Sequence, residues 1–179
     1  MALVDQLRER REAVLERWLD VALGDYPEET ARFLRTERDQ FANPVGHSTR
    51  RGLEGLLGWL LRETGRDEAQ ALLDGIVRIR ALQDLSAGRA LAFILELKEL
   101  IRAELAAEIE AGRISQEELC TLEKRVDGLA LLAFDIYVEC REQIHRIRLE
   151  ELRRASWAAS RLARERGLSS DQLARQEGV

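Results

Sequence analysis

The longest hydrophobic pattern in the sequence lies between Leu119 and Ile147 and predicts one long α-helix. Its apolar positions recur at alternating spacings of three and four, which places them on one helix face. They are Leu119, Leu122, Val126, Leu129, Ala133, Ile136, Cys140, Ile144 and Ile147. Between Leu129 and Val138 the other faces are also mostly apolar, which predicts a segment surrounded by protein. Asp135, the one charge in this segment, is therefore expected to be buried and paired.

The same helix changes character after Cys140, where most positions off the apolar face are charged or polar. Only a narrow apolar strip continues, and such a strip suits pairing with one other helix. We therefore predict a homodimer in which two copies meet along a seam formed by Cys140, Ile144, Ile147 and Leu152.

Apolar positions with helical spacing also precede the long helix. They predict helices over residues 3–23, 27–40, 44–62, 66–83 and 87–111. No strand alternation, internal repeat or low-complexity linker is found. The sequence therefore predicts an all-α fold. We expect a helical domain over residues 1–152 and a helical extension with a frayed tail over residues 153–179.

Several helix boundaries carry recognisable end signals. Asn43 precedes a proline and is expected to cap the helix that follows, as is Ser86 for the next but one. Gly112 is a typical helix end. Ser115 and Glu118 have the spacing of a capping box, which predicts the start of the long helix.

Four glycines lie within the predicted helix over residues 44–62, at Gly46, Gly52, Gly55 and Gly58. Each costs about 1 kcal/mol relative to alanine in a helix interior, so some other interaction must offset them. Two explanations remain open: close approach of a neighbouring helix, or a ligand lying against bare backbone.

Composition and charge narrow the function classes. The chain has 179 residues, is 45% hydrophobic and 34% charged, and has a formal net charge of −5, so we expect no nucleic-acid partner. Cys120 and Cys140 are about 30 Å apart on one helix, too far for a disulfide. With no signal peptide and no membrane-length apolar run, we expect a cytoplasmic location. A basic end around Trp157 is diluted by glutamates, so no membrane contact is expected either.

Candidate polar residues point to ion pairing rather than to chemistry. Arg78 and Arg80 lie within an apolar run, and Asp135 lies in the apolar part of the long helix. Charges inside a helical bundle need partners, so we predict a buried polar cluster. Its members are Arg78, Arg80, Asp84, Asp135, Glu139 and His47, with Arg50 or Arg51 as further partners.

Sequence signals for a metal site, a haem site or an enzyme are weaker than those for ion pairing. His47 could ligate a metal or haem, or could be a polar residue at a helix start. A haem globin needs an axial ligand where this chain offers Arg78, Arg80, Gln83 and Asp84, so no haem and no other cofactor is expected. Glu142 and His145 form one Glu-x-x-His pair, whereas a di-metal bundle needs two.

Three segments together resemble a known family. They are RFLR (32–35) with FANPVGH (41–47), IVRIRALQD (76–84) and AFDIYVECRE (133–142). They resemble the N-terminal domain of the RsbT co-antagonist proteins of the bacterial stressosome, the RsbRD type, over about residues 15–152. The resemblance implies a globin-like, non-haem helical bundle that forms a homodimer and serves as a sensory or protein-contact domain.

In that family the last helix leads into a phosphorylatable STAS domain, and this sequence stops before such a domain. We therefore predict a non-enzymatic, free-standing sensor or adaptor with an unidentified regulatory protein as partner. The alternative is a globin-like carrier of a small apolar ligand or haem. An enzyme using Asp135, Glu139 and His145 is a third class, which requires a polar pocket around those residues.

Overall fold

The computed structural model describes residues 2–62, 65–83 and 85–165, and all regular structure in these ranges is helical. The all-α prediction is confirmed, whereas a globin-like arrangement stays a prediction. The helices are α1 (Ala2–Glu9), α2 (Arg11–Leu23), α3 (Glu28–Thr36), α4 (Pro44–Arg62), α5 (Arg66–Leu82), α6 (Ala87–Glu104), α7 (Ala106–Glu110) and α8 (Gln116–Glu165). The chain divides into two compact units, residues 1–140 and 141–179.

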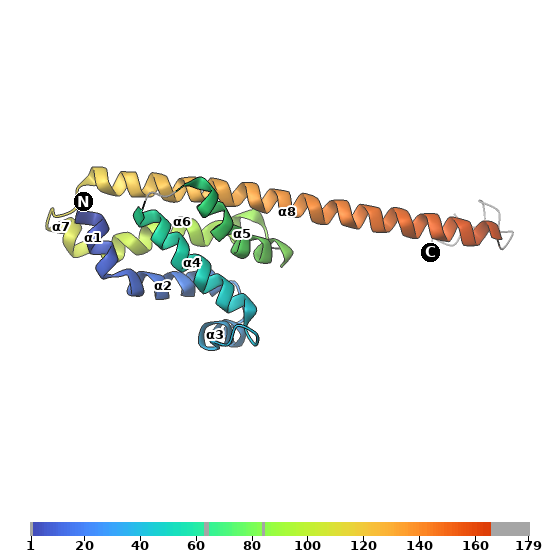
Figure 1. The fold of residues 1–179 in the computed structure, drawn as a ribbon, viewed down its shortest axis with the longest axis horizontal. Helices are drawn as coiled ribbons and strands as arrows, with labels where there is room; N and C mark the ends of the chain where they lie inside the picture. Colours follow the sequence, from blue (N-terminus) through green and yellow to red (C-terminus); the bar gives the residue numbers. More distant parts are fainter. Residues whose placement is uncertain (1, 63–64, 84, 166–179) are drawn as a thin grey trace. The chain divides into compact units, whose positions relative to one another are not determined.

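The first unit has one hydrophobic core, in which α2 packs on α6 and α4 packs on α5 (Figure 1). The largest side chains at its centre are Trp18 and Phe93, both fully buried. Their ring centroids lie 6.3 Å apart. The indole nitrogen of Trp18 donates a hydrogen bond of 2.7 Å to the carbonyl oxygen of Phe93. The core therefore satisfies the one polar group that its largest side chain brings in.

The predicted capping residues agree with the structure, whereas the helix predicted over residues 27–40 ends at Thr36. The side chain of Asn43 accepts a hydrogen bond from the Gly46 amide at 2.8 Å, and Ser86 caps α6. Ser115 and Glu118 bond each other reciprocally in front of α8, as a capping box requires. Gly112 follows α7 with a φ of 68°, a backbone conformation that favours glycine. These local signals act within a few residues, so the sequence alone sufficed to predict them.

Two predicted helices are each broken once. The first breaks at Arg10, where φ is −101° and ψ is 11°, and the fifth breaks at Leu105. The two breaks face each other, because Arg10 donates a hydrogen bond of 2.5 Å to the carbonyl oxygen of Glu104 and forms an ion pair with the buried Glu108. The break turns α1 so that Leu3 and Leu7 are buried, and the predicted continuous helix was wrong here.

The predicted full burial of the middle of the long helix is also wrong. One face of α8 is buried, with Leu129, Ala133 and Ile136 packed inward. The opposite face is open: Leu131 is 70% exposed and Phe134 is 48% exposed. The sequence pattern identified the inner face correctly. It could not show that the bundle covers α8 from one side only.

The glycines of α4 have two different explanations. A Cβ at Gly46 would collide with the Leu34 carbonyl oxygen and the Asn43 side chain, and one at Gly52 would lie 2.7 Å from the Ile76 side chain. Gly55 is closed in the same way by Leu72. Close packing therefore accounts for three of the four glycines. At Gly58 a Cβ would meet only the end of the Arg62 side chain, at 3.3 Å.

A matched pair of alanine substitutions tests this distinction. We expect Gly46→Ala to lower the free energy of unfolding by at least about 2 kcal/mol, because the methyl group collides with backbone and disrupts the Asn43 cap. Gly58→Ala is expected to raise it by up to about 1 kcal/mol, through helix propensity. Urea unfolding followed by circular dichroism measures both. Equal effects of the two substitutions would contradict the packing explanation.

Candidate functional site

The structure separates the residues of the predicted polar cluster. Arg80 alone is buried, with 3% of its surface exposed. It donates hydrogen bonds of 2.7 Å to the carbonyl oxygens of Ala22 and Ala90, and one of 3.1 Å to that of Arg89. It also pairs with the carboxylate of Asp25. All sides of this guanidinium group are thus held by protein.

The other members that the structure describes are partly or fully exposed, so the predicted buried cluster is wrong for them. Arg78 pairs at 2.7 Å with Asp74 on its own helix, and the side chain of Asp135 is 64% exposed, 3.7 Å from Arg66. Glu139 and His47 are exposed. Asp84 lies outside the described residues. No polar pocket therefore gathers these side chains.

Helix geometry explains the error. Asp135 lies four positions after the exposed Leu131, and Glu139 lies four positions after Asp135, so both acids lie on the open face of α8 rather than on the buried one. The expected partner Arg50 instead binds Glu16 on α2, at 2.6 Å. The hydrogen bond from this guanidinium group lowers the pKa of Glu16. The acid that does pair with Arg80, Asp25, was missed because it lies in the turn after α2, distant in the sequence.

The three sequence segments that carry the family resemblance (32–47, 76–84 and 133–142) have mainly structural roles. The Asn43 amide nitrogen donates to the carbonyl oxygens of Leu34 and Glu37, at 2.8 and 2.9 Å, which joins the end of α3 to the start of α4. In the segment 76–84, Arg80 joins three helix ends. In the segment 133–142, the Tyr137 hydroxyl donates to the Leu85 carbonyl oxygen at 2.5 Å. These three residues therefore hold the bundle together.

The open face of α8 in the first unit is the candidate functional surface. We call Leu131, Phe134 and Val138 the outer α8 face; all three are exposed. They recur at spacings of three and four, so they form one apolar stripe. Single exposed apolar residues are ordinary, but a stripe of large ones on a helix is typical of an interaction surface.

Ion pairs between α6 and α8 hold α8, and with it this surface, in place. Lys98 pairs with Asp127 at 2.5 Å, and Arg102 with Glu123 at 2.6 Å, so the two helices run antiparallel. The hydrogen bond to Glu123 raises the pKa of Arg102. One turn beyond these pairs lies Leu95 on α6, which is also exposed and extends the apolar surface beyond α8.

The predicted dimer seam has a mixed outcome. Cys140 is 6% exposed, so it packs within the chain rather than being presented to a second copy. In the second unit Ile144 is partly exposed, and Ile147 and Leu152 are exposed. For those three residues the seam stays a prediction.

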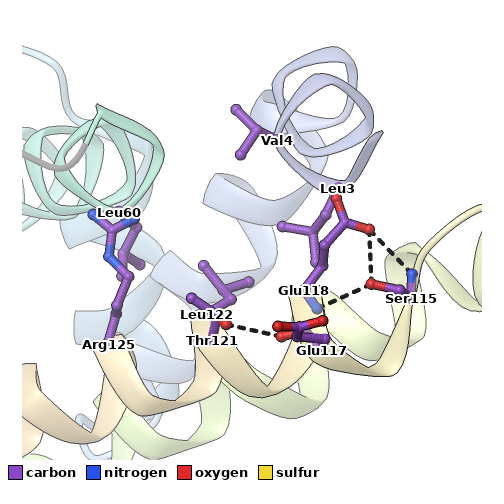
Figure 2. Close-up of a pocket in the computed structure, with 9 residues that line it drawn as sticks. All are labelled: Leu3, Val4, Leu60, Ser115, Glu117, Glu118, Thr121, Leu122 and Arg125. Carbon is purple, nitrogen blue, oxygen red and sulfur yellow. Dashed lines mark hydrogen bonds between the residues drawn. The ribbon is translucent and has the colours of Figure 1, made fainter. Parts of the chain in front are cut away.

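A pocket of about 240 Å³ lies between α1, α4 and the start of α8 (Figure 2). Its apolar walls come from Leu3, Leu60 and Leu122, and its polar rim includes Glu118 and Arg125. The hydrogen bond from the Ser115 amide lowers the pKa of Glu118. The rim therefore carries charges of both signs next to an apolar interior.

Two features are absent from the described part of the chain. Within residues 2–62, 65–83 and 85–165, no group of three or more histidine, cysteine or acidic side chains could hold a metal ion. Over the same ranges, no helix combines the length and the apolar character needed to span a membrane.

Comparison with known proteins identifies a family. A family model described as the RsbT co-antagonist protein rsbRD N-terminal domain matches residues 12–152. The match contains all three peculiar segments and leaves out α1. No curated protein and no solved structure matches the chain.

The role of Arg80 can be tested against its neighbour on the same helix. We expect Arg80→Gln to lower the free energy of unfolding by about 3 kcal/mol, because it leaves Asp25 and buried carbonyl oxygens without their donor. Arg78→Gln removes an exposed ion pair and should cost less than about 1 kcal/mol. Urea unfolding at neutral pH compares them. Similar losses in both variants would show that Arg80 does not organise the core.

Proposed function

The chain belongs to the family of RsbT co-antagonist protein rsbRD N-terminal domains, a stressosome-associated regulatory family, and on this premise we propose that it acts as a dimeric, non-enzymatic sensory domain. The outer α8 face is the observation that carries the proposal. Leu131, Phe134 and Val138 form an exposed apolar stripe on a helix that is firmly held by its own bundle. A second copy of the chain is the partner that we assign to this stripe.

Burial supplies the driving force for this pairing. Each large apolar side chain that becomes fully buried contributes about 1.5–3 kcal/mol. Two-fold symmetry doubles every contact, so Leu131, Phe134 and Val138 of both chains take part. Part of this gain offsets the lost freedom of two associating molecules. Polar residues such as Asp135 lie beside the stripe and can stay hydrated at its edge.

The second unit contributes a contact of its own in the proposal. Ile147 and Leu152 are exposed there, and both belong to the seam predicted from the sequence. Ile144 lies close to them in sequence. A regulator or ligand that favours one packing of the paired helices shifts the equilibrium between their arrangements. In this way the domain passes a signal to a regulatory protein without carrying out a reaction.

The structural role of the peculiar segments supports a non-enzymatic function. Side-chain donors of these segments bind backbone carbonyl oxygens of neighbouring helices and turns, as seen for Asn43, Arg80 and Tyr137. The candidate acid–base residues Asp135 and Glu139 are exposed on α8. An acid–base site needs such groups to converge in a pocket, and here they face outward.

A second candidate function has one observation in its favour. The pocket in Figure 2 has a volume of about 240 Å³ and apolar walls. An engineered apolar cavity of about 150 Å³ binds benzene, so this pocket has room for a somewhat larger molecule. The pocket therefore supports, as the second candidate function, a carrier of a small apolar ligand.

Light scattering coupled to size-exclusion chromatography tests the dimer. We expect a dimer at tens of micromolar for the wild-type chain and a monomer for Phe134→Glu, because a carboxylate at the centre of the stripe cannot be buried unpaired. Phe41→Glu is the matched control, since Phe41 is 87% exposed in the loop before α4. The control should stay dimeric, and both variants should keep the wild-type circular dichroism.

Two results would contradict the proposed dimer surface. One is a wild-type monomer at these concentrations. The other is a dimer that survives Phe134→Glu and dissociates with Ile147→Glu, which would place the interface in the second unit alone.

Native mass spectrometry distinguishes the carrier from the sensor that needs no cargo. A carrier retains a small apolar molecule at one per chain, and Leu122→Trp, which fills the pocket from α8, should abolish retention. Leu149→Trp provides the control, because Leu149 is exposed in the second unit. A wild-type chain that carries no added mass after expression would contradict the carrier function.

A further inference from the structure

An open groove of about 600 Å³ lies between α1, α2, α4 and α5 in the first unit. Four arginines line it, whereas Glu54 is the single acid among its lining residues. We call this the arginine groove; its arginines are Arg8, Arg11, Arg51 and Arg62. The whole chain has a net charge of −5, so this concentration of positive charge runs against the average. Positive charges grouped in one groove repel each other, and a bound anion relieves this repulsion. The groove is therefore a candidate anion site.

The floor of the groove is an unusual stretch of α4. Arg51, Gly55, Gly58 and Arg62 follow each other at spacings of four, three and four, so they lie on one helix face. Two glycines thus separate two arginines. Packing against Leu72 explains Gly55, but a Cβ at Gly58 would meet only the end of the Arg62 side chain. The backbone at Gly58 therefore lies open to the groove, beneath a guanidinium group.

Hydrogen bonds to the backbone hold two of the arginines at this floor. Arg11 donates to the carbonyl oxygen of Glu54 at 3.2 Å, and Arg62 donates to that of Gly58 at 3.2 Å. Each bond uses one N–H group of a guanidinium that has five. Apart from the 3.5 Å contact of Arg62 with Glu68, the remaining donors of these two groups stay available to a ligand.

The ion pairs of these arginines are weak or absent. Arg8 is 3.6 Å from Asp5, and Arg62 is 3.5 Å from Glu68, both at exposed positions. Such pairs contribute little and exchange readily. Arg51 has no ion pair among the described residues. Two of the four arginines thus have weak, exposed ion pairs, and the groove keeps a net positive charge with Glu54 as the single acid in its lining.

Phosphate groups suit this arrangement, because guanidinium groups bind phosphate oxygens through two parallel hydrogen bonds. The volume is within the usual range for small-molecule sites and exceeds the needs of one phosphate. Leu61 and Leu72 add an apolar surface on the same groove. We propose that the arginine groove binds a nucleoside di- or triphosphate, with the phosphates on the arginines and the base against Leu61 and Leu72.

This site is separate from the outer α8 face, since none of its lining residues belongs to α8. Nucleotide binding therefore does not depend on the dimer. The sequence alone does not predict this site, because its arginines come from three helices and have no common spacing. Only Arg51 and Arg62, with the glycines between them, share a recognisable pattern on one helix.

Isothermal titration calorimetry on the full chain tests the proposal with ATP and GTP as probes. Adenosine, inorganic phosphate and tripolyphosphate serve as comparison probes in the same buffer. We expect at least one nucleotide to bind more tightly than all three comparison probes. Arg51→Gln and Arg62→Gln should each weaken that binding at least tenfold. Arg148→Gln makes the same charge change in the second unit and should leave the affinity unchanged.

A further variant separates the groove from general folding effects. Gly58→Leu places a bulky side chain on the open floor and should weaken nucleotide binding at least fivefold, with unchanged circular dichroism. The proposal is overturned if neither nucleotide binds at millimolar concentration, or if tripolyphosphate binds as tightly as the nucleotides. It is also overturned if Arg148→Gln loses as much affinity as Arg51→Gln, or if Gly58→Leu binds normally.

Discussion

Three helix ends meet at one buried guanidinium group, that of Arg80. Guanidinium groups are always charged in proteins, so a buried one must be matched by partners inside the bundle. The last turn of α2 contributes the Ala22 carbonyl oxygen, the first turn of α6 contributes two more, and Asp25 supplies the countercharge. The ring of Phe93 lies 5.2 Å from the guanidinium carbon. Moving any of these helix ends would remove at least one partner of the buried charge, so Arg80 ties their positions together.

This arrangement explains why the family resemblance says more about the fold than about the chemistry. The segments that carry it supply Asn43, Arg80 and Tyr137, each of which joins neighbouring elements through backbone carbonyl oxygens. With these groups committed to structure, the parts of the first unit left to recognise other molecules are at its surface. The outer α8 face is apolar and the arginine groove is positively charged, so the two surfaces suit different partners.

The one-sided burial of α8 gives the helix two roles in the first unit. Its inner face, with Leu129, Ala133 and Ile136, completes the core. Its outer face presents Leu131 and Phe134, and ion pairs to α6 keep that face in place. A surface mounted on a rigid, well-packed helix loses little freedom when it meets a partner, which favours association.

The sequence by itself determined the helical class, most helix boundaries and the inner face of α8, because periodicity and capping act over short distances. It predicted the caps at Asn43, Ser86 and Ser115. The apolar run around Arg78 and Arg80 predicted burial of both, and only Arg80 is buried. Tertiary structure alone decided the rest. The break at Arg10, the pairing of Arg80 with Asp25 and the exposure of Phe134 and Asp135 all depend on which distant segments approach each face. A residue pattern shows which side of a helix is apolar, but only the packed chain shows which apolar side is covered.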